Sequence, residues 1–163
     1  MSSKIVCYGV VFSLLCLVGC GGEEKTVRLH QASLPQLHVI NVLDEQYYND
    51  AHIVGSENVP FDNFEKTVQA HFNDGSWNTS DRFVIYCANY QCSASSEAAK
   101  FLKSLQATDV AVYEGGMAEW KQKGYPTEGP AAESYLTMVG EHQAGLCGEI
   151  PCLSAEGLKA LII

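Results

Sequence analysis

The most reactive side chains in this sequence belong to its cysteines, and four of the seven fall in two pairs with the same spacing. Cys87 and Cys92 form one C-x4-C pair, and Cys147 and Cys152 form the other. Cysteine thiolates act as nucleophiles, exchange with disulfides and bind metal ions. Cys87 directly follows the most strand-like run in the chain, Arg82–Tyr86 (RFVIY), so the first pair is the stronger candidate for chemistry.

The first pair lies in a short loop between that predicted strand and a helix predicted over 93–105. Such a loop must curl tightly, so its backbone N–H groups and those of the first helical turn would point toward its centre and favour an anion there. They would also favour the thiolate of Cys87, which predicts a better nucleophile than a free cysteine. The alternative is that Cys87 is a small buried apolar residue. The predicted substrate-binding loop residues are Ala88, Asn89, Tyr90, Gln91 and Ser93, of which Ser93 is also the predicted helix N-cap.

Strand-like and helix-like segments alternate around this loop, with no long linker and no repeat. Short apolar and β-branched runs predict strands, and apolar residues at helical spacing predict helices. The alternation indicates an α/β layer fold with a parallel sheet, in which ligands bind at the carboxyl ends of the strands. The predicted strands cover 37–43, 82–86 and 110–113, and 53–60 predicts a turn followed by a brief strand that ends at Pro60. The predicted helices cover 44–48, 61–72, 93–105 and 115–123.

Three sequence motifs, in order, resemble those of the rhodanese-like family. His52–Pro60 (HIVGSENVP) is similar to the family's HIxGAxNxP turn, and Val84–Cys87 (VIYC) to its VxYC active-site strand. Tyr113–Trp120 (YEGGMAEW) with Gly124–Pro126 is similar to its closing GGxxxW and GYP motifs. The resemblance covers about 38–130.

This resemblance implies a single domain over 37–130, with a mostly parallel central sheet flanked by helices and a short C-terminal extension over 131–163. It also implies that Cys87 accepts a sulfane sulfur, holds it as a persulfide against the loop amides, and passes it to a nucleophilic acceptor. No metal or organic cofactor is implied. The partners are then a sulfane-sulfur donor and a thiol acceptor or a redox partner protein.

The sequence departs from the family pattern in ways that bear on the substrate. The loop residues 88–92 contain no basic side chain, and the chain has a formal net charge of -9, so the anion thiosulfate is a doubtful natural donor. The family's acidic-x-Arg pair is replaced by Asn41 and Leu43 around Val42. A related phosphatase loop would need arginine at the position of Ser93, so phosphatase activity is disfavoured.

Cys92 is the most informative departure. Its thiol could attack a persulfide or sulfenic acid on Cys87 and close a disulfide, as a resolving cysteine does. Alternatively, Cys92 only packs beneath the start of the helix. Three functions therefore stay open: a sulfurtransferase with Cys87 as carrier, a thiol–disulfide redox protein that uses Cys87 and Cys92, and a catalytically idle module that binds a partner.

The extension lies outside the resemblance. The apolar residues of 134–144 predict a partly buried helix, and Cys147 and Cys152 predict a local structural disulfide. The alternatives for these two cysteines are a redox pair that exchanges with Cys87 and Cys92, or a metal site of four thiolates.

Four other side chains have simpler interpretations. His52 is expected to make structural hydrogen bonds in its turn, and a general-base role is the less favoured alternative. Tyr113 and Trp120 are expected in the core. Tyr90 either lines the pocket or faces solvent.

The N-terminus predicts export. Residues 1–19 combine one cation with an apolar run too short to cross a membrane, which is typical of a signal peptide. Leu17–Cys20 (LVGC) resembles the bacterial lipobox, which implies lipidation of Cys20 after cleavage, with 20–36 as a tether. We therefore expect a protein anchored to a bacterial membrane by its lipid and facing the periplasm or the cell exterior. The surplus of acidic residues argues against nucleic-acid binding.

Overall fold

The structure is a computed structural model that describes residues 34–141 and 148–163. The predicted signal peptide, the lipidation site Cys20 and the extension's Cys147 lie outside the described residues. The elements are β1 (Leu37–Asn41), α1 (Glu45–Asp50), β2 (His52–Ile53), β3 (Glu57–Asn58), η1 (Phe61–Asn63), α2 (Phe64–Asp74), β4 (Arg82–Tyr86), α3 (Ala94–Ser104), β5 (Asp109–Tyr113), α4 (Gly116–Gln122), β6 (Thr127–Glu128), η2 (Ser134–Thr137) and α5 (Ala155–Ile162).

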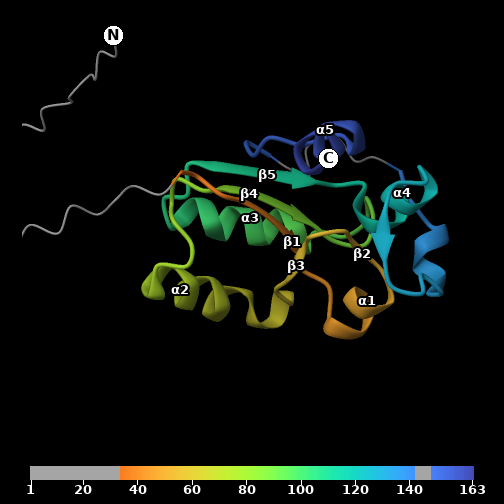
Figure 1. Ribbon diagram of the computed structural model, residues 1–163, viewed down its shortest axis with the longest axis horizontal. Coiled ribbons are helices and arrows are strands. Elements are labelled where there is room, and N and C mark those ends of the chain that lie inside the picture. Colours follow the sequence, from red (N-terminus) through yellow and green to blue (C-terminus); the bar gives the residue numbers. More distant parts are fainter. Residues whose placement is uncertain (1–33, 142–147) are drawn as a thin grey trace, which may run out of the picture. The chain divides into compact units, whose positions relative to one another are not determined.

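A parallel sheet of four strands, in the order β3-β1-β4-β5, forms the centre of the fold (Figure 1). The last residues of three strands, Asn41, Tyr86 and Tyr113, lie side by side in the pairing register. The segments that follow these strands therefore meet at one edge of the sheet. This arrangement confirms the predicted α/β fold with a parallel sheet, and it places Cys87 at that edge.

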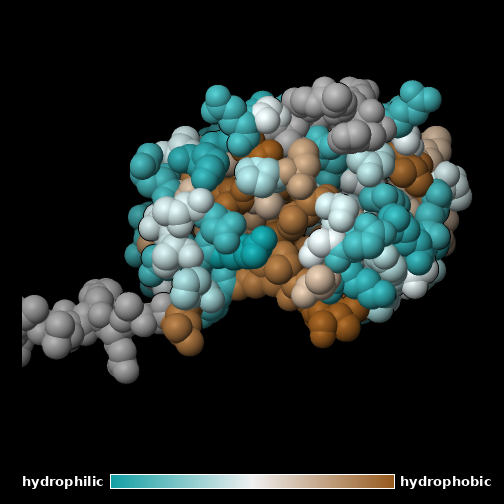
Figure 2. Space-filling model, turned by 90° about the horizontal axis from the view of Figure 1, so that it is seen from above, coloured by the Kyte–Doolittle hydropathy of each residue, from teal (hydrophilic) through white to brown (hydrophobic). Residues whose placement is uncertain are grey.

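Helices cover both faces of the sheet, and the strands alternate their side chains between two cores. Helices α2 and α3 lie on one face, and α5 lies on the other (Figure 1). The core on the α2 and α3 side includes Ile40, Phe83, Ile85, Val112, Phe64, Val68 and Leu102. The core on the α5 side includes Val39, Val84, Tyr86, Tyr113, Met117, Trp120 and Leu158. Seen from above, hydrophobic residues gather in the middle of the surface between hydrophilic flanks (Figure 2).

The C-terminal extension covers the free edge of β5. The amide of Val112 donates to the carbonyl of Pro151 at 2.9 Å, and the amide of Leu153 donates to the carbonyl of Val112 at 2.8 Å. Leu158 of α5 is fully buried. Pairing of this kind protects an edge strand from association with other chains. No helix in the described ranges is long and apolar enough to span a membrane.

The predicted helix over 134–144 is wrong for the part of it that the structure describes. Only the 3-10 turn η2 forms, and the chain then runs through Met138 and Val139 to Gly140, which has a φ of +75°. The carbonyls of Met138 and Val139 accept hydrogen bonds from the loop after β4. A continued helix would have used these carbonyls internally, so the tertiary contact has replaced local helix formation.

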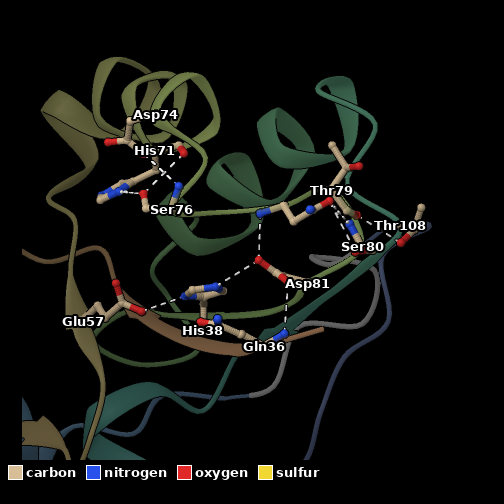
Figure 3. Close-up of polar contacts among 11 residues, drawn as sticks. Gln36, His38, Glu57, His71, Asp74, Ser76, Thr79, Ser80, Asp81 and Thr108 are labelled. Carbon is tan, nitrogen blue, oxygen red and sulfur yellow. Dashed lines mark hydrogen bonds and ion pairs between the residues drawn. The ribbon is translucent and has the colours of Figure 1, made fainter. Parts of the chain in front are cut away.

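A buried histidine joins two carboxylates near the amino ends of β1 and β4 (Figure 3). His38 Nδ1 lies 2.8 Å from Glu57 Oε1, and Nε2 lies 3.3 Å from Asp81 Oδ2. His38 and Asp81 are buried. Burial by itself lowers the pKa of His38, but the hydrogen bonds and charges of Glu57 and Asp81 outweigh it, so the pKa is raised.

This arrangement predicts a pH-dependent stability. The folded-state pKa of His38 lies above the value in the unfolded chain, so the stabilisation is complete below about pH 6.5 and is lost as the pH rises through the folded-state pKa. The contribution to the free energy of unfolding falls by at most about 1.4 kcal/mol per pH unit. Urea denaturation between about pH 6 and pH 9 measures it.

The matched variants for this prediction are His38→Gln and His71→Gln. His38→Gln should remove this part of the pH dependence, whereas His71→Gln should keep it because His71 stacks on Trp77 and hydrogen-bonds Ser76 away from the two carboxylates. Equal slopes for wild type and His38→Gln would contradict the prediction.

Candidate active site

The structure brings the two predicted site cysteines together. Cys87 directly follows β4 and is 2 % exposed. Its Sγ is bonded to Sγ of Cys92, and the two Cα atoms lie 6.4 Å apart. This separation is within the range that disulfides span. The loop is therefore in a closed, disulfide form.

Asn89 makes the turn that returns the chain from Cys87 to Cys92. Its carbonyl accepts the amide of Cys92 at 3.1 Å, and its Oδ1 accepts the amide of Gln91 at 3.0 Å. Its Nδ2 donates to the carbonyl of Met138 at 2.7 Å. Asparagine favours such turns because its side chain can bond the backbone two residues further on. The sequence predicts Asn89 only as a residue of the substrate-binding loop, and this positioning role becomes visible in the structure.

Three amides of the predicted anion cradle already have hydrogen-bond partners in this disulfide state. The amide of Tyr90 donates to the carbonyl of Val139 at 3.2 Å, and the amides of Gln91 and Cys92 donate to Asn89. The loop's own asparagine and the C-terminal extension thus supply the partners of these three amides. Ser93 occupies the N-cap position, but its Oγ donates to Glu97 Oε1 at 3.0 Å and caps no amide.

The amino end of α4 supports the loop from the other side. The amide of Met117 donates to the carbonyl of Cys87, and the amide of Ala118 to that of Ala88, both at 2.9 Å. Gly116 has a φ of +59°, and a Cβ there would lie 2.5 Å from the oxygen of Cys87. The glycine of the YEGG motif is thus required for the close approach of helix and loop.

The HIVGSENVP turn holds β4 and the end of β1. The hydroxyl of Tyr86 accepts the amide of Ile53 at 3.0 Å and lies 2.8 Å from Ser56 Oγ. Burial raises the pKa of Tyr86 to about 12. Asn58 Nδ2 donates to the carbonyl of Leu43 at 2.8 Å. This bond holds the segment that follows the end of β1 in place.

His52 has the structural role that the sequence predicts. Its Nδ1 donates to the carbonyl of Tyr48 at 2.9 Å, its ring stacks on that of Tyr48, and its Nε2 lies 3.0 Å from Glu128 Oε2. These contacts connect the turn to α1 through Tyr48 and to β6 through Glu128.

The aromatic residues near the site are mostly structural. Tyr113 and Trp120 are fully buried, as predicted, and Trp120 Nε1 donates to the carbonyl of Pro126 at 2.8 Å. Tyr90 is half-buried, and burial together with Glu119 raises its pKa.

A small apolar pocket opens beside the loop. Its lining residues are Leu43, Tyr47, Ala88 and Tyr135, and its volume is about 160 Å³. The rings of Tyr47 and Tyr135 meet edge to face, with centroids 5.6 Å apart. Of the predicted loop residues, Ala88 is the one that lines this pocket.

The second cysteine pair is described only in part. Cys152 is disulfide-bonded, whereas Cys147, its predicted partner, lies outside the described residues. A metal site of all four thiolates would require reduction of the Cys87–Cys92 bond.

The fold and the cysteine loop define the class of protein. The family model of the rhodanese-like domain matches residues 26–123, so the chain belongs to this family. This confirms the family resemblance seen in the motifs.

Solved structures show the same fold. The X-ray structure of a rhodanese-like domain from Anabaena sp. is 30% identical, with a TM-score of 0.50 over 58% of this chain and 88% of that chain. A solution structure of a rhodanese-like domain from Anabaena sp. is 26% identical, with a TM-score of 0.51 over 68% of this chain and 78% of that chain. A thiosulfate sulfurtransferase from Pseudomonas aeruginosa, 22% identical over 58% of this chain and 17% of that chain, has the same fold with a TM-score of 0.50. A search of curated proteins found no match.

Proposed function

We propose that the protein is a sulfurtransferase that carries sulfane sulfur as a persulfide on Cys87 and uses Cys92 as a resolving thiol. One observation carries this proposal: in a rhodanese-like fold, the cysteine at the end of β4 is bonded to a second cysteine in the same loop. The support is that Cys92 Sγ lies in bonding contact with Cys87 Sγ, which is the contact that a resolving thiol must make.

The proposed cycle starts from the reduced loop. The thiolate of Cys87 attacks the outer sulfur of an organic persulfide donor, RSSH, forms Cys87–S–SH and releases RS⁻. A thiol acceptor can then attack the outer sulfur, take it as a new persulfide and release the Cys87 thiolate. Alternatively, the Cys92 thiolate attacks Cys87 Sγ, which forms the Cys87–Cys92 disulfide and releases HS⁻. Two equivalents of an external thiol reduce this disulfide and are oxidised to their own disulfide.

The same observation favours a second candidate, a thiol–disulfide redox protein. In that case Cys87 and Cys92 lose two electrons to a disulfide of a partner protein, and no sulfur atom is transferred. The two functions differ in whether sulfide is released when the loop disulfide forms.

Mass spectrometry of the Cys87 peptide tests the proposal. The reduced protein is incubated with cysteine persulfide, and we expect a gain of one sulfur atom on Cys87 that dithiothreitol removes. The Cys87–Cys92 disulfide should then form with one sulfide released per disulfide. Disulfide formation without sulfide would support the redox candidate, and no sulfur on Cys87 with any sulfane donor would overturn the sulfurtransferase.

We place this activity outside the cytoplasm, with the protein anchored by a lipid on Cys20. The support is the signal-like composition of 1–19 and the lipobox-like LVGC sequence. Persistent disulfides are typical of exported proteins, and Cys87, Cys92 and Cys152 are disulfide-bonded. Membrane fractionation of wild type and Cys20→Ala checks the anchor, because only the wild type should partition with the membrane.

A further inference from the structure

The apolar pocket beside the loop is lined by the residue that follows Cys87. Ala88, which lines the pocket, is the next residue after Cys87 in the chain. The amide of Val42 donates to the carbonyl of Tyr86 at 3.1 Å, and this bond extends the pairing of β1 and β4 to the loop. Leu43 follows directly and forms another wall. The pocket is therefore attached to the ends of the two strands that hold the reactive sulfur.

The size and lining of the pocket limit what it can bind. All four lining residues are apolar or aromatic, and none carries a charge. The volume of about 160 Å³ is below that of pockets for drug-sized ligands, which begin at about 300 Å³. A carbon group the size of one amino-acid side chain fits this space, and the edge-to-face rings of Tyr47 and Tyr135 favour an aromatic group.

The charges around the pocket disfavour an anion. The carboxylate of Asp50, whose charge acts on the lining residue Tyr135, accepts the amides of Ala132 and Glu133 at 3.0 and 3.1 Å. Burial, and then the charges of Asp50 and Glu133, raise the pKa of Tyr135. Lys121 Nζ donates to the carbonyl of Ala131. An anionic group would lose water in an apolar pocket that faces acidic neighbours, which costs free energy without a compensating cation.

We infer that the thiol that attacks at Cys87 carries an uncharged, apolar carbon group, which binds in the pocket of Leu43, Tyr47, Ala88 and Tyr135. This rests on the proposed role of Cys87 as the reacting sulfur. In the disulfide state the thiolate RS⁻ attacks Cys87 Sγ, an R–S–S–Cys87 bond forms, and Cys92 leaves as a thiolate that takes up a proton. A second thiol then releases RSSR and leaves Cys87 reduced.

The test is the rate at which two thiols reduce the Cys87–Cys92 disulfide of the wild-type protein. The thiols are benzyl mercaptan, which is apolar, and 2-mercaptoethanesulfonate, which is an anion. Each rate is divided by the rate of the same thiol with a small reference disulfide, because the thiols differ in pKa and nucleophilicity. We expect the corrected rates to differ by about tenfold or more in favour of benzyl mercaptan, which corresponds to about 1.4 kcal/mol. Equal corrected rates would overturn the inference.

Two variants and one control test whether the preference for benzyl mercaptan arises in this pocket. Tyr135→Ala should bring the ratio of corrected rates close to one, and Leu43→Lys should shift it toward the anion. Phe61→Ala should leave the ratio unchanged, because Phe61 is an exposed aromatic residue in a separate groove between α2 and α3. A wild-type ratio in both Tyr135→Ala and Leu43→Lys would show that the preference arises elsewhere and would overturn the inference.

A second pair of probes separates small thiols from protein thiols. Blocked dipeptides with cysteine beside phenylalanine or beside glutamate replace the two free thiols. A preference confined to the free thiols identifies a low-molecular-mass thiol, and the same preference in the dipeptides identifies a thiol carried by a peptide; both support the apolar pocket. The assay needs only the disulfide, so failure of persulfide formation and failure of this inference are distinguishable.

Discussion

Cys92→Ser should hold a persulfide on Cys87 that wild type loses rapidly. In the wild type, the sulfur of Cys92 is held in bonding contact with Sγ of Cys87 by the turn at Asn89. An attacking group positioned in this way reacts far faster than a free thiol, so we expect the lifetime of the persulfide to rise by on the order of a hundredfold or more in the variant. The rate of sulfide release should fall by the same factor.

The measurement is mass spectrometry of the Cys87 peptide, with sulfide determined in parallel, after a short pulse of cysteine persulfide. Cys87→Ser is the matched control, because it removes the carrier and keeps Cys92, and it should show neither persulfide nor loop disulfide. Sulfide release from Cys92→Ser at the wild-type rate would show that Cys92 does not resolve the persulfide.

Gly116→Ala should destabilise the protein by about 3 kcal/mol or more. A non-glycine residue at the observed φ of +59° costs about 1 to 2 kcal/mol. In addition, its Cβ would lie 2.5 Å from the oxygen of Cys87 and 2.6 Å from the carbonyl carbon of Ala88. These are backbone atoms, so the loop itself must shift, and the hydrogen bonds from Met117 and Ala118 must stretch.

Gly124→Ala provides the matched control for this prediction. Gly124 has a similar φ of +69°, but a Cβ there meets nothing within 4 Å. Gly124→Ala should therefore lose only the stability that a non-glycine residue costs at positive φ, about 1 to 2 kcal/mol. Urea denaturation gives both free energies of unfolding. If the two variants lost equal stability, the close approach of α4 to the loop would not matter energetically.

The loop that Gly116 supports should also react differently in the variant. A shifted carbonyl at Cys87 moves the whole turn, so Gly116→Ala should form the Cys87–Cys92 disulfide more slowly than Gly124→Ala under the same oxidant. Trapping of free thiols with an alkylating reagent over time measures this rate.

Local patterns predicted the central elements well because each of those segments has one physically stable arrangement. Arg82–Tyr86 is a strand over the predicted residues, since four consecutive buried residues suit a central parallel strand covered on both faces. The helix after the loop begins at Ala94 with Ser93 as N-cap residue, as expected. The motifs also placed Cys87 at the carboxyl edge of the sheet.

The extension shows where local patterns fail. Its apolar residues predict a partly buried helix over 134–144, yet Met138 is 58% exposed and the chain turns at Gly140. The carbonyls of Met138 and Val139 bond Asn89 and Tyr90 of the loop, which lie far away in the sequence. Helix propensity depends on neighbouring residues and therefore cannot predict such a contact.

The sequence by itself determined the fold, the family and the position of the candidate nucleophile, because strand and helix periods and tight turns depend on neighbouring residues. Only the tertiary structure decided that Cys92 is bonded to Cys87, that the amides of Tyr90, Gln91 and Cys92 have partners, and that Tyr135 helps to close an apolar pocket. The disulfide lies within one loop, but the turn that closes it is held by segments distant in the chain, through Asn89 with Met138 and through Cys87 with Met117. The pocket also joins distant segments, so its geometry depends on how the whole core packs.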